Sequence, residues 1–276
     1  MKDQEIAIFD PCFSEYETAF RAFGFRPQSI TLSPEKDFQA DPLQIFTLLN
    51  SINKLKIIVL GNPASPTGKL YGEFLPNLQE YCEERKIILI LDEAFIDFSS
   101  ADNSAWNLLK KNTNLILIRS LTKFYSIPGL RIGYGILHPE KIKQIESYQY
   151  PWSVNALAQA VGAEVILDTG FQEKTRNWTI DERIFMLHEL NSIPEIEVFS
   201  SETNFLLFRV RDNNKATAQD LYANLLSQSL LIRNCGNFKG LNESFFRISL
   251  RERRDNQKLV ESIYDYFSTR QRDFKK

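Results

Sequence analysis

The sequence predicts an α/β protein with a mixed, mostly parallel sheet in a large first domain and a smaller α+β domain after it. Three apolar runs, at 55–60, 86–91 and 114–119, lack glycine and proline and are rich in leucine and isoleucine, which is typical of strands buried on both faces. Beyond residue 168, strand-like and helix-like segments alternate differently, as in a small α+β unit. We therefore expect a large domain over 1–168 and a small domain with a linking helix over 169–276.

The strand order within the first domain follows from the spacing of its elements. Between the first two apolar runs, five apolar residues recur at helical spacing: Phe74, Leu75, Leu78, Tyr81 and Cys82. A strand, a helix and a strand in succession predict a parallel pair. The segment 131–137 reads as another strand, but too few residues separate it from 114–119 for a crossover helix, so we expect this pair to be antiparallel.

Two helical segments, 155–168 and 171–190, lie on either side of the expected boundary near residue 168, and the second is long enough to bridge two domains. The expected strands and helices then follow in turn: strands at 195–201 and 203–210, a helix at 217–228, a strand at 245–250 and a closing helix at 257–270. No glycine- and serine-rich linker separates the halves, so we expect them to pack closely.

The composition fits a soluble globular protein: of 276 residues, 43% are hydrophobic and 25% charged. A formal net charge of −2 argues against a nucleic-acid partner. The cysteines Cys12, Cys82 and Cys235 are widely spaced and form no CxxC pair, so we expect neither disulfides nor a metal site, and a cytoplasmic location. No apolar run approaches the length of a membrane span, and no export signal is visible at the first residues.

Polar side chains follow each of the three apolar runs. The first leads into GNPASPTG, the second into DEAF and the third into SLTK, which ends at Lys123. In open α/β sheets, ligands bind beyond the carboxyl ends of the strands, so these groups are expected to meet in one crevice. An amine beside the Asp92 carboxylate is the arrangement that pyridoxal phosphate needs: Lys123 would form the Schiff base and Asp92 would hold the pyridine nitrogen protonated.

Three of these stretches resemble the signatures of a known family. GNPASPTG, LDEAFIDF and SLTKFYSIPGLRIGY are similar, in the right order, to motifs of the fold type I pyridoxal-phosphate enzymes of the class I/II aminotransferase superfamily. The resemblance extends over nearly the whole chain and implies the large domain of a pyridoxal-phosphate-dependent transferase-like fold. DPCFSEY, DEAFIDF, TKFYSIPGLR and PWSVNALAQA look most like the branch that decarboxylates L-threonine O-3-phosphate to aminopropanol phosphate in cobalamin biosynthesis. The histidinol-phosphate aminotransferases are the close alternative.

The resemblance assigns roles to individual residues. It gives Lys123 the covalent link to the cofactor, Asp92 the pyridine nitrogen, and Ser120 with Arg131 the cofactor phosphate. Phe13 falls where the family stacks an aromatic ring on the cofactor, although ordinary core packing is the alternative for this residue.

Other assigned positions include departures from the family pattern. Ser65 stands where asparagine is common near the phenolic oxygen of the cofactor and can still donate through its hydroxyl, whereas Phe95 replaces a tyrosine and cannot donate. Arg247 matches the arginine that grips the substrate carboxylate, with an ion pair to an acid on a neighbouring strand as the alternative. Two interpretations stay open for Arg233 and Lys239: they contact a substrate phosphate, or they lie in a solvated loop.

Structural alternatives and partners complete these expectations. Asp92 and Glu93 could instead cap the backbone after a strand. The family forms homodimers, so we expect a homodimer acting on a small phosphorylated amino acid. Compared with the family, the chain begins at the strand before PCFSEY, so the sheet is expected to lack a strand and the phosphate cradle a turn. That start also motivates a reading of another class, a non-catalytic remnant that serves as a partner subunit.

Overall fold

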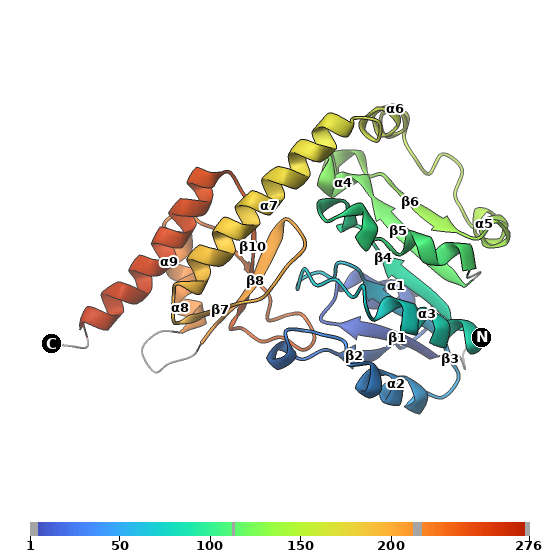
Figure 1. Ribbon diagram of the computed structural model, residues 1–276, viewed down its shortest axis with the longest axis horizontal. Coiled ribbons are helices and arrows are strands. Elements are labelled where there is room, and N and C mark those ends of the chain that lie inside the picture. Colours follow the sequence, from blue (N-terminus) through green and yellow to red (C-terminus); the bar gives the residue numbers. More distant parts are fainter. Residues whose placement is uncertain (1–4, 112–113, 212–216, 274–276) are drawn as a thin grey trace.

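Two sheets with surrounding helices make up the protein (Figure 1). The computed structural model describes residues 5–111, 114–211 and 217–273. The six-stranded sheet and the four-stranded sheet lie side by side, and the long helix α7 (Thr169–Asn191) runs from one to the other.

The six-stranded sheet is mixed, with the strand order β2-β1-β3-β4-β5-β6. Its strands are β1 (Glu5–Asp10), β2 (Gln28–Thr31), β3 (Leu55–Gly61), β4 (Ile88–Asp92), β5 (Leu115–Ser120) and β6 (Gly133–Leu137). Strands β1 to β5 pair in parallel, whereas β6 runs antiparallel to β5. The prediction of a mixed, mostly parallel sheet with this antiparallel pair is therefore confirmed.

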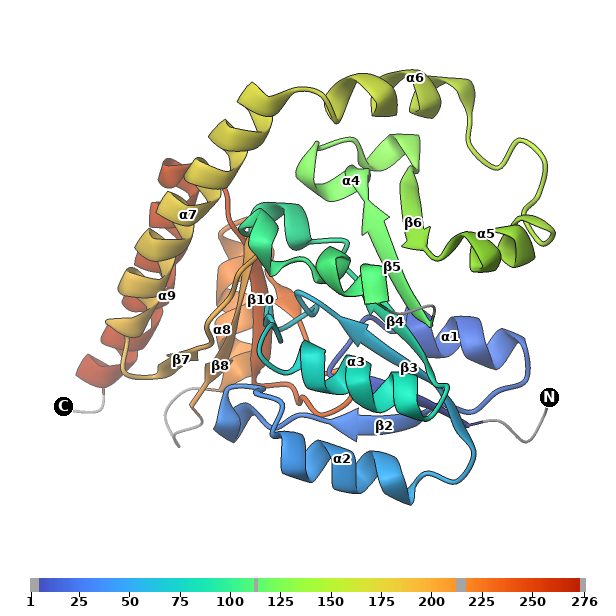
Figure 2. The same cartoon turned by 45° about the vertical axis from the view of Figure 1, so that its right-hand side comes forward.

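One face of this sheet is covered by helices α2 and α3, which lie on the same side of the strands in Figure 2. The helices of this part are α1 (Glu15–Ala22), α2 (Pro42–Ser51), α3 (Leu75–Glu84), α4 (Leu121–Phe124), α5 (Pro139–Glu146) and α6 (Ala156–Val165). The five apolar residues predicted to form one helix face at 74–82 are all buried. Leu78 of α3 belongs to the same core cluster as Leu89 and Leu117 of the sheet.

The opposite face of the sheet is covered less completely. Helix α1 packs there on β1 and β3, in a cluster that contains Ile6, Ile8 and Val59. On β5, Ile116 is only half-buried and Ile118 is 43% exposed. The expectation that 114–119 is buried on both faces is therefore wrong, because the cluster around α1 does not extend to this strand.

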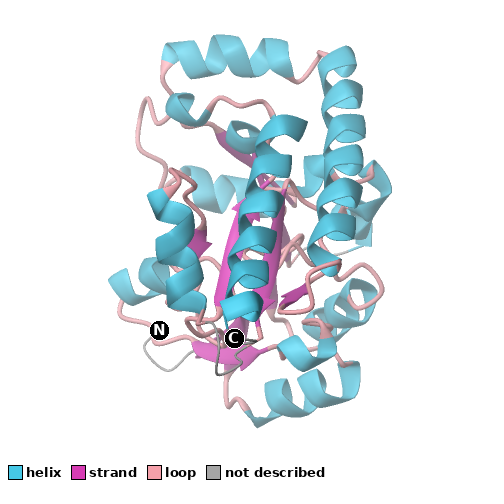
Figure 3. Cartoon of the chain, turned by 90° about the vertical axis from the view of Figure 1, so that its left-hand side faces the viewer, coloured by secondary structure: helices cyan, strands magenta, loops and turns pink. Residues whose placement is uncertain are grey.

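The four-stranded sheet has the order β7-β8-β10-β9 and is antiparallel. Its elements are β7 (Ile196–Val198), β8 (Phe205–Val210), α8 (Ala218–Ser227), β9 (Arg233–Asn234), β10 (Phe245–Ser249) and α9 (Arg253–Asp273). Leu206 and Phe208 of β8 pack with Leu221 of α8 and Ile263 of α9 in a second core. Figure 3 shows long helices in front of these strands.

Helix α7 joins the two parts. The Asp168 side chain accepts a hydrogen bond from the N–H of Phe171 at 2.9 Å, which caps the helix and separates it from α6. The ring of Phe171 contacts Phe124 of α4, while Met186 belongs to the second core. We propose residue 168 as the domain boundary, because α7 begins directly after it and carries the chain from one core to the other.

The cysteines Cys12, Cys82 and Cys235 are buried and free. Burial raises the pKa of Cys235 to about 11 and that of Cys82 to about 12, so both remain thiols at neutral pH. Within the described ranges, no three potential metal ligands among histidine, cysteine and the acids come together. No helix in this part of the chain is both long and apolar enough to cross a membrane.

Candidate active site

Lys123 lies on the short helix α4, which begins directly after β5. Ser120, the last residue of β5, caps this helix: its Oγ accepts from the N–H of Thr122 at 3.4 Å. The Nζ of Lys123 donates to the same Ser120 Oγ at 3.2 Å. The structure therefore brings together Lys123 and Ser120, as their spacing in the sequence predicts.

The charge on Lys123 is destabilised by its surroundings. Partial desolvation is the largest cause lowering the pKa of its ammonium, the Asp92 carboxylate opposes the shift, and the Arg131 guanidinium adds to it. The ammonium also lies over the ring of Phe95, with Nζ 5.5 Å from the ring centroid. A lower pKa makes the neutral, nucleophilic amine accessible nearer to physiological pH.

Asp92 ends β4 and has both carboxylate oxygens hydrogen-bonded. Oδ1 accepts from the N–H of Ala94 at 2.8 Å, and Oδ2 accepts from the hydroxyl of Tyr16 at 2.6 Å. The capping alternative thus also describes Asp92, since its side chain satisfies a backbone donor after the strand. Sequence reasoning missed Tyr16, because no local pattern connects residues 76 positions apart.

Phe13 precedes α1 and is 49% exposed, so the alternative of core packing is wrong for this residue. Its ring meets the ring of Tyr16 edge-on, with the centroids 6.0 Å apart. An exposed aromatic ring therefore lies beside the tyrosine that contacts Asp92.

Ser65 and Arg247 meet although 182 positions separate them. Nη1 of Arg247, on β10, donates to the Oγ of Ser65 at 3.0 Å. The guanidinium also lies over Phe205, with its central carbon 5.0 Å from the ring centroid, and Phe205 in turn meets Phe95 edge-on at 5.1 Å. Because Phe95 also lies under the Lys123 ammonium, these contacts connect the Arg247 side of the site to Lys123.

The environment of Arg247 contains a second guanidinium rather than an acid. Its direct neighbours across the sheet are Leu207 on β8 and Arg233 on β9. Desolvation is the main cause lowering the pKa of Arg247; Cys235 opposes this shift, and Arg233 adds to it. The alternative of a cross-strand ion pair with an acid therefore does not describe Arg247. Like charges directly opposite each other on a sheet are unfavourable, so this pair is suited to an anion.

The remaining candidates lie at the surface. Arg131 has a left-handed backbone (φ 53°), and its Nη1 donates to the carbonyl of Pro128 at 3.0 Å. Arg233 donates to Asn237 at 2.9 Å. Lys239 forms an ion pair with Glu17 on α1, which is 2.5 Å away.

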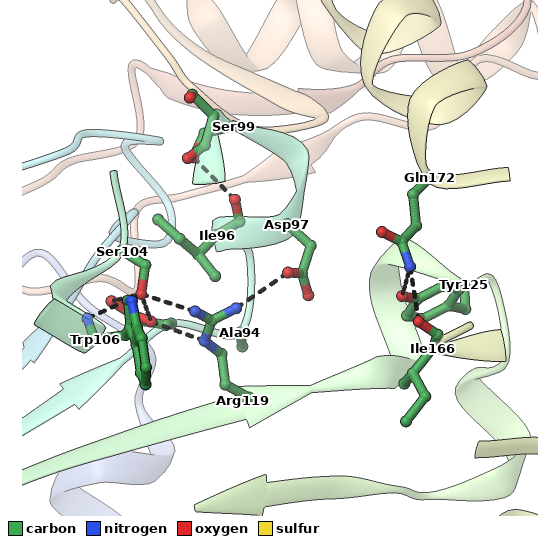
Figure 4. Close-up of polar contacts among 12 residues, drawn as sticks. Ala94, Ile96, Asp97, Ser99, Ser104, Trp106, Arg119, Tyr125, Ile166 and Gln172 are labelled. Carbon is green, nitrogen blue, oxygen red and sulfur yellow. Dashed lines mark hydrogen bonds and ion pairs between the residues drawn. The ribbon is translucent and has the colours of Figure 1, made fainter. Parts of the chain in front are cut away.

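A second polar cluster lies at the same strand ends, on the other side of the sheet from Asp92 and Ser120 (Figure 4). We call this side the back and the side of Asp92 and Ser120 the front. Arg119, the neighbour of Ser120, pairs with Glu93 at 2.8 Å and with Asp97 at 3.1 Å, and donates to Ser104 at 2.8 Å. Burial raises the pKa of Glu93, while Arg119 opposes that shift. The Glu93 side chain is fully buried, so here the second acid of DEAF has a structural partner.

With this geometry described, the comparison with known proteins identifies the class. The chain matches the aminotransferase class I and II family over residues 1–263 and belongs to that family. Its members are enzymes that use pyridoxal phosphate.

Individual relatives define the branch more closely. The threonine-phosphate decarboxylase of Salmonella typhimurium is 32% identical over 265 residues, covering 95% of this chain and 71% of that protein. A protein of Caldanaerobacter subterraneus subsp. tengcongensis, provisionally assigned as a threonine-phosphate decarboxylase, is 35% identical over 259 residues, covering 93% and 69%. The crystal structure of the histidinol-phosphate aminotransferase from Clostridium acetobutylicum superposes with a TM-score of 0.89 at 31% identity, covering 96% and 78%.

The residues present fit pyridoxal phosphate. The aldehyde of the cofactor requires an amine of lowered pKa, which Lys123 has. Its ring nitrogen requires a carboxylate with a free acceptor position, and each oxygen of Asp92 has one hydrogen-bond donor and can accept a second. The half-exposed ring of Phe13 offers a surface for the face of the cofactor ring.

Proposed function

We propose that this protein uses pyridoxal phosphate to decarboxylate L-threonine O-3-phosphate to aminopropanol phosphate, a step of cobalamin biosynthesis. The single observation that carries the reaction class is the position of the Lys123 amine near the Asp92 carboxylate, at the carboxyl ends of β4 and β5. Desolvation lowers the pKa of this amine. Relatives named for this decarboxylation support the choice of substrate.

The proposed roles follow from the contacts of each side chain. When bound, the cofactor would supply a protonated ring that withdraws the electron pair left by departing carbon dioxide. Lys123 would hold the cofactor aldehyde through Nζ and return a proton to the substrate carbon that lost the carboxylate. Asp92 would accept a hydrogen bond from the protonated ring nitrogen, and the Phe13 ring would stack on the face of the cofactor ring. Ser120 and Arg131 would hold the cofactor phosphate.

The substrate has two anionic groups, and the protein offers two guanidiniums opposite each other on β9 and β10. Arg247 would hold the carboxylate. Ser65 accepts a hydrogen bond from Arg247 and would orient it, and its own hydroxyl would donate a hydrogen bond to the phenolic oxygen of the cofactor. Arg233 would meet the phosphate. Guanidiniums bind such anions through paired, charge-assisted hydrogen bonds.

We also propose that the protein acts as a homodimer in the cytoplasm, on a small phosphorylated amino acid. The support is the family, and a surface around α5 and α6 that exposes large apolar side chains, including Tyr148, Trp152 and Leu157. Light scattering of the purified protein measures its mass in solution: we expect the mass of two chains of 32.0 kDa each, and the mass of one chain would contradict the proposed dimer.

The test of the reaction is a comparison of two assays on the same preparation with added pyridoxal phosphate. We expect carbon dioxide release from L-threonine O-3-phosphate without a keto acid. Transamination of histidinol phosphate that depends on 2-oxoglutarate, without carbon dioxide release, would instead establish the second candidate. The superposition on the Clostridium aminotransferase is the observation that favours this candidate. A colourless protein that takes up no cofactor would favour the non-catalytic remnant.

A further inference from the structure

We propose that Tyr16 is a positioning residue that aligns the Asp92 carboxylate and the Phe13 ring around one cofactor ring. The proposal rests on the proposed function in that it presupposes a bound pyridoxal phosphate, but it applies equally to decarboxylation and to aminotransfer. Tyr16 ends the DPCFSEY motif, but neither the motif nor the assigned site gives this residue a role.

Tyr16 is connected to both groups at once. Its backbone N–H donates to the carbonyl of Phe13 at 3.1 Å, and its ring meets the Phe13 ring edge-on. Its hydroxyl donates to Oδ2 of Asp92 at 2.6 Å. One side chain therefore joins the residue proposed to stack on the cofactor to the residue proposed to contact the ring nitrogen.

The hydrogen bonds of Asp92 explain why the tyrosine hydroxyl matters. The N–H of Ala94 donates to Oδ1 and Tyr16 to Oδ2, so each oxygen has its own donor. A carboxylate held at both oxygens cannot rotate about its last bond without losing a hydrogen bond, which costs about 0.5–1.5 kcal/mol. The plane of the carboxylate is thereby fixed before any ligand arrives, and preorganisation of this kind strengthens binding.

Tyr16 is also held firmly itself. It packs against the cluster formed by Ile6, Ile8, Cys12 and Val59 beneath α1. Desolvation, with Asp92 as the next cause, raises the pKa of the Tyr16 phenol well above its ordinary value. The phenol therefore remains protonated and can donate a hydrogen bond at neutral pH.

Tyr16→Phe removes only the hydroxyl and keeps the ring contact with Phe13. Tyr81→Phe is the matched control, because the Tyr81 hydroxyl donates to Asn50 at 3.0 Å, between α3 and α2. Pyridoxal phosphate is titrated into each protein and followed by its visible absorbance. We expect the dissociation constant to rise about 10-fold in Tyr16→Phe and less than 2-fold in Tyr81→Phe, with both proteins melting within a few degrees of the wild type.

A double-mutant cycle with Asp92→Asn separates positioning from general loosening of the fold. If Tyr16 acts through Asp92, its substitution should change the dissociation constant less than 2-fold in the Asp92→Asn background. An equal factor in both backgrounds, or cofactor binding in Tyr16→Phe as tight as in the wild type, would overturn the proposal while leaving the proposed function standing. A wild-type protein that develops no visible band would refute both.

Discussion

The front and the back of the same two strand ends differ in how completely their polar groups are paired. On the back, the buried Glu93 pairs at 2.8 Å with Arg119, whose side chain is only 12% exposed. On the front, Lys123 is exposed, and its ammonium donates a hydrogen bond to the Ser120 hydroxyl without an ion pair to an acid among the described residues. Residues that are neighbours in sequence thus have opposite environments.

This difference follows from the alternation of side chains along a strand. Asp92 and Glu93 are consecutive, as are Arg119 and Ser120, so one residue of each pair faces each side of the sheet. The paired cluster on the back fixes the ends of β4 and β5. The front groups are thereby held in place with hydrogen-bonding capacity left for a ligand. Substitutions on the back should therefore affect stability, and substitutions on the front should affect binding and chemistry.

The largest effect is expected on the front, at Lys123. Lys123→Ala should abolish the visible absorbance of the protein with pyridoxal phosphate and reduce turnover by about 10⁴-fold, because the covalent amine and proton donor are lost. The melting temperature should change by no more than a few degrees, since the side chain is exposed. Lys143→Ala on α5 is the control and should keep both absorbance and turnover. Full colour in the Lys123 variant would refute the assignment.

On the back, Arg119→Met should lower the free energy of unfolding by about 3–5 kcal/mol, because it leaves Glu93 buried without its cation. Urea denaturation measures this change. Arg21→Ala, which removes an exposed pair with Glu17, should cost less than about 1 kcal/mol. The folded Arg119 variant should still bind the cofactor. If this variant lost the visible band while its free energy of unfolding stayed unchanged, the division between a stabilising back and a binding front would be wrong.

Substrate recognition should respond at Arg247. Arg247→Gln is expected to raise the KM for L-threonine O-3-phosphate by about 10–100-fold, the worth of a charged hydrogen bond, while the visible band persists. Arg209→Gln, on the neighbouring strand β8 where Arg209 pairs with Glu197, is the control and should leave the KM nearly unchanged. An unaltered KM in the Arg247 variant would remove this residue from the substrate site.

The smallest expected effect is a shift in the pH dependence of Lys123. Because desolvation lowers the pKa of its ammonium, labelling of Lys123 by trinitrobenzenesulfonate should reach half its maximal rate at a lower pH than labelling of a model lysine amide, whose pKa is about 10.4. Asp92 raises the pKa of Lys123, so Asp92→Asn should move the midpoint lower still. Peptide mass mapping follows the residue, and a midpoint that rises in Asp92→Asn would contradict the described electrostatics.

The sequence predicted the parts of the fold that have a strong hydrophobic pattern. The three apolar runs form β3, β4 and β5. The helical spacing of apolar residues between the first two runs predicted α3, and the short connection after the third run predicted the antiparallel β6. Strand β2 was not predicted, because of its four residues Ile30 alone is buried and the others are polar or exposed. Helix α2 was missed as well, although Asp41 caps it and Pro42 begins it, and both are signals that a sequence carries.

The candidate site shows the same limit. Lys123, Ser120 and Asp92 lie directly at the ends of apolar runs, so their position follows from the strands alone. The contacts of Tyr16 with Asp92 and of Arg247 with Ser65 join residues 76 and 182 positions apart, and they depend on how α1 and β10 pack against the sheet. No local pattern contains that information.

The most direct test of the central claim is to locate the covalent link to the cofactor. The protein is incubated with pyridoxal phosphate, reduced with borohydride and digested, and the modified peptide is identified by mass. We expect a single stoichiometric phosphopyridoxyl group on Lys123, with the visible absorbance of the bound cofactor lost on reduction. Labelling of another lysine, or no labelling at all, would contradict the account.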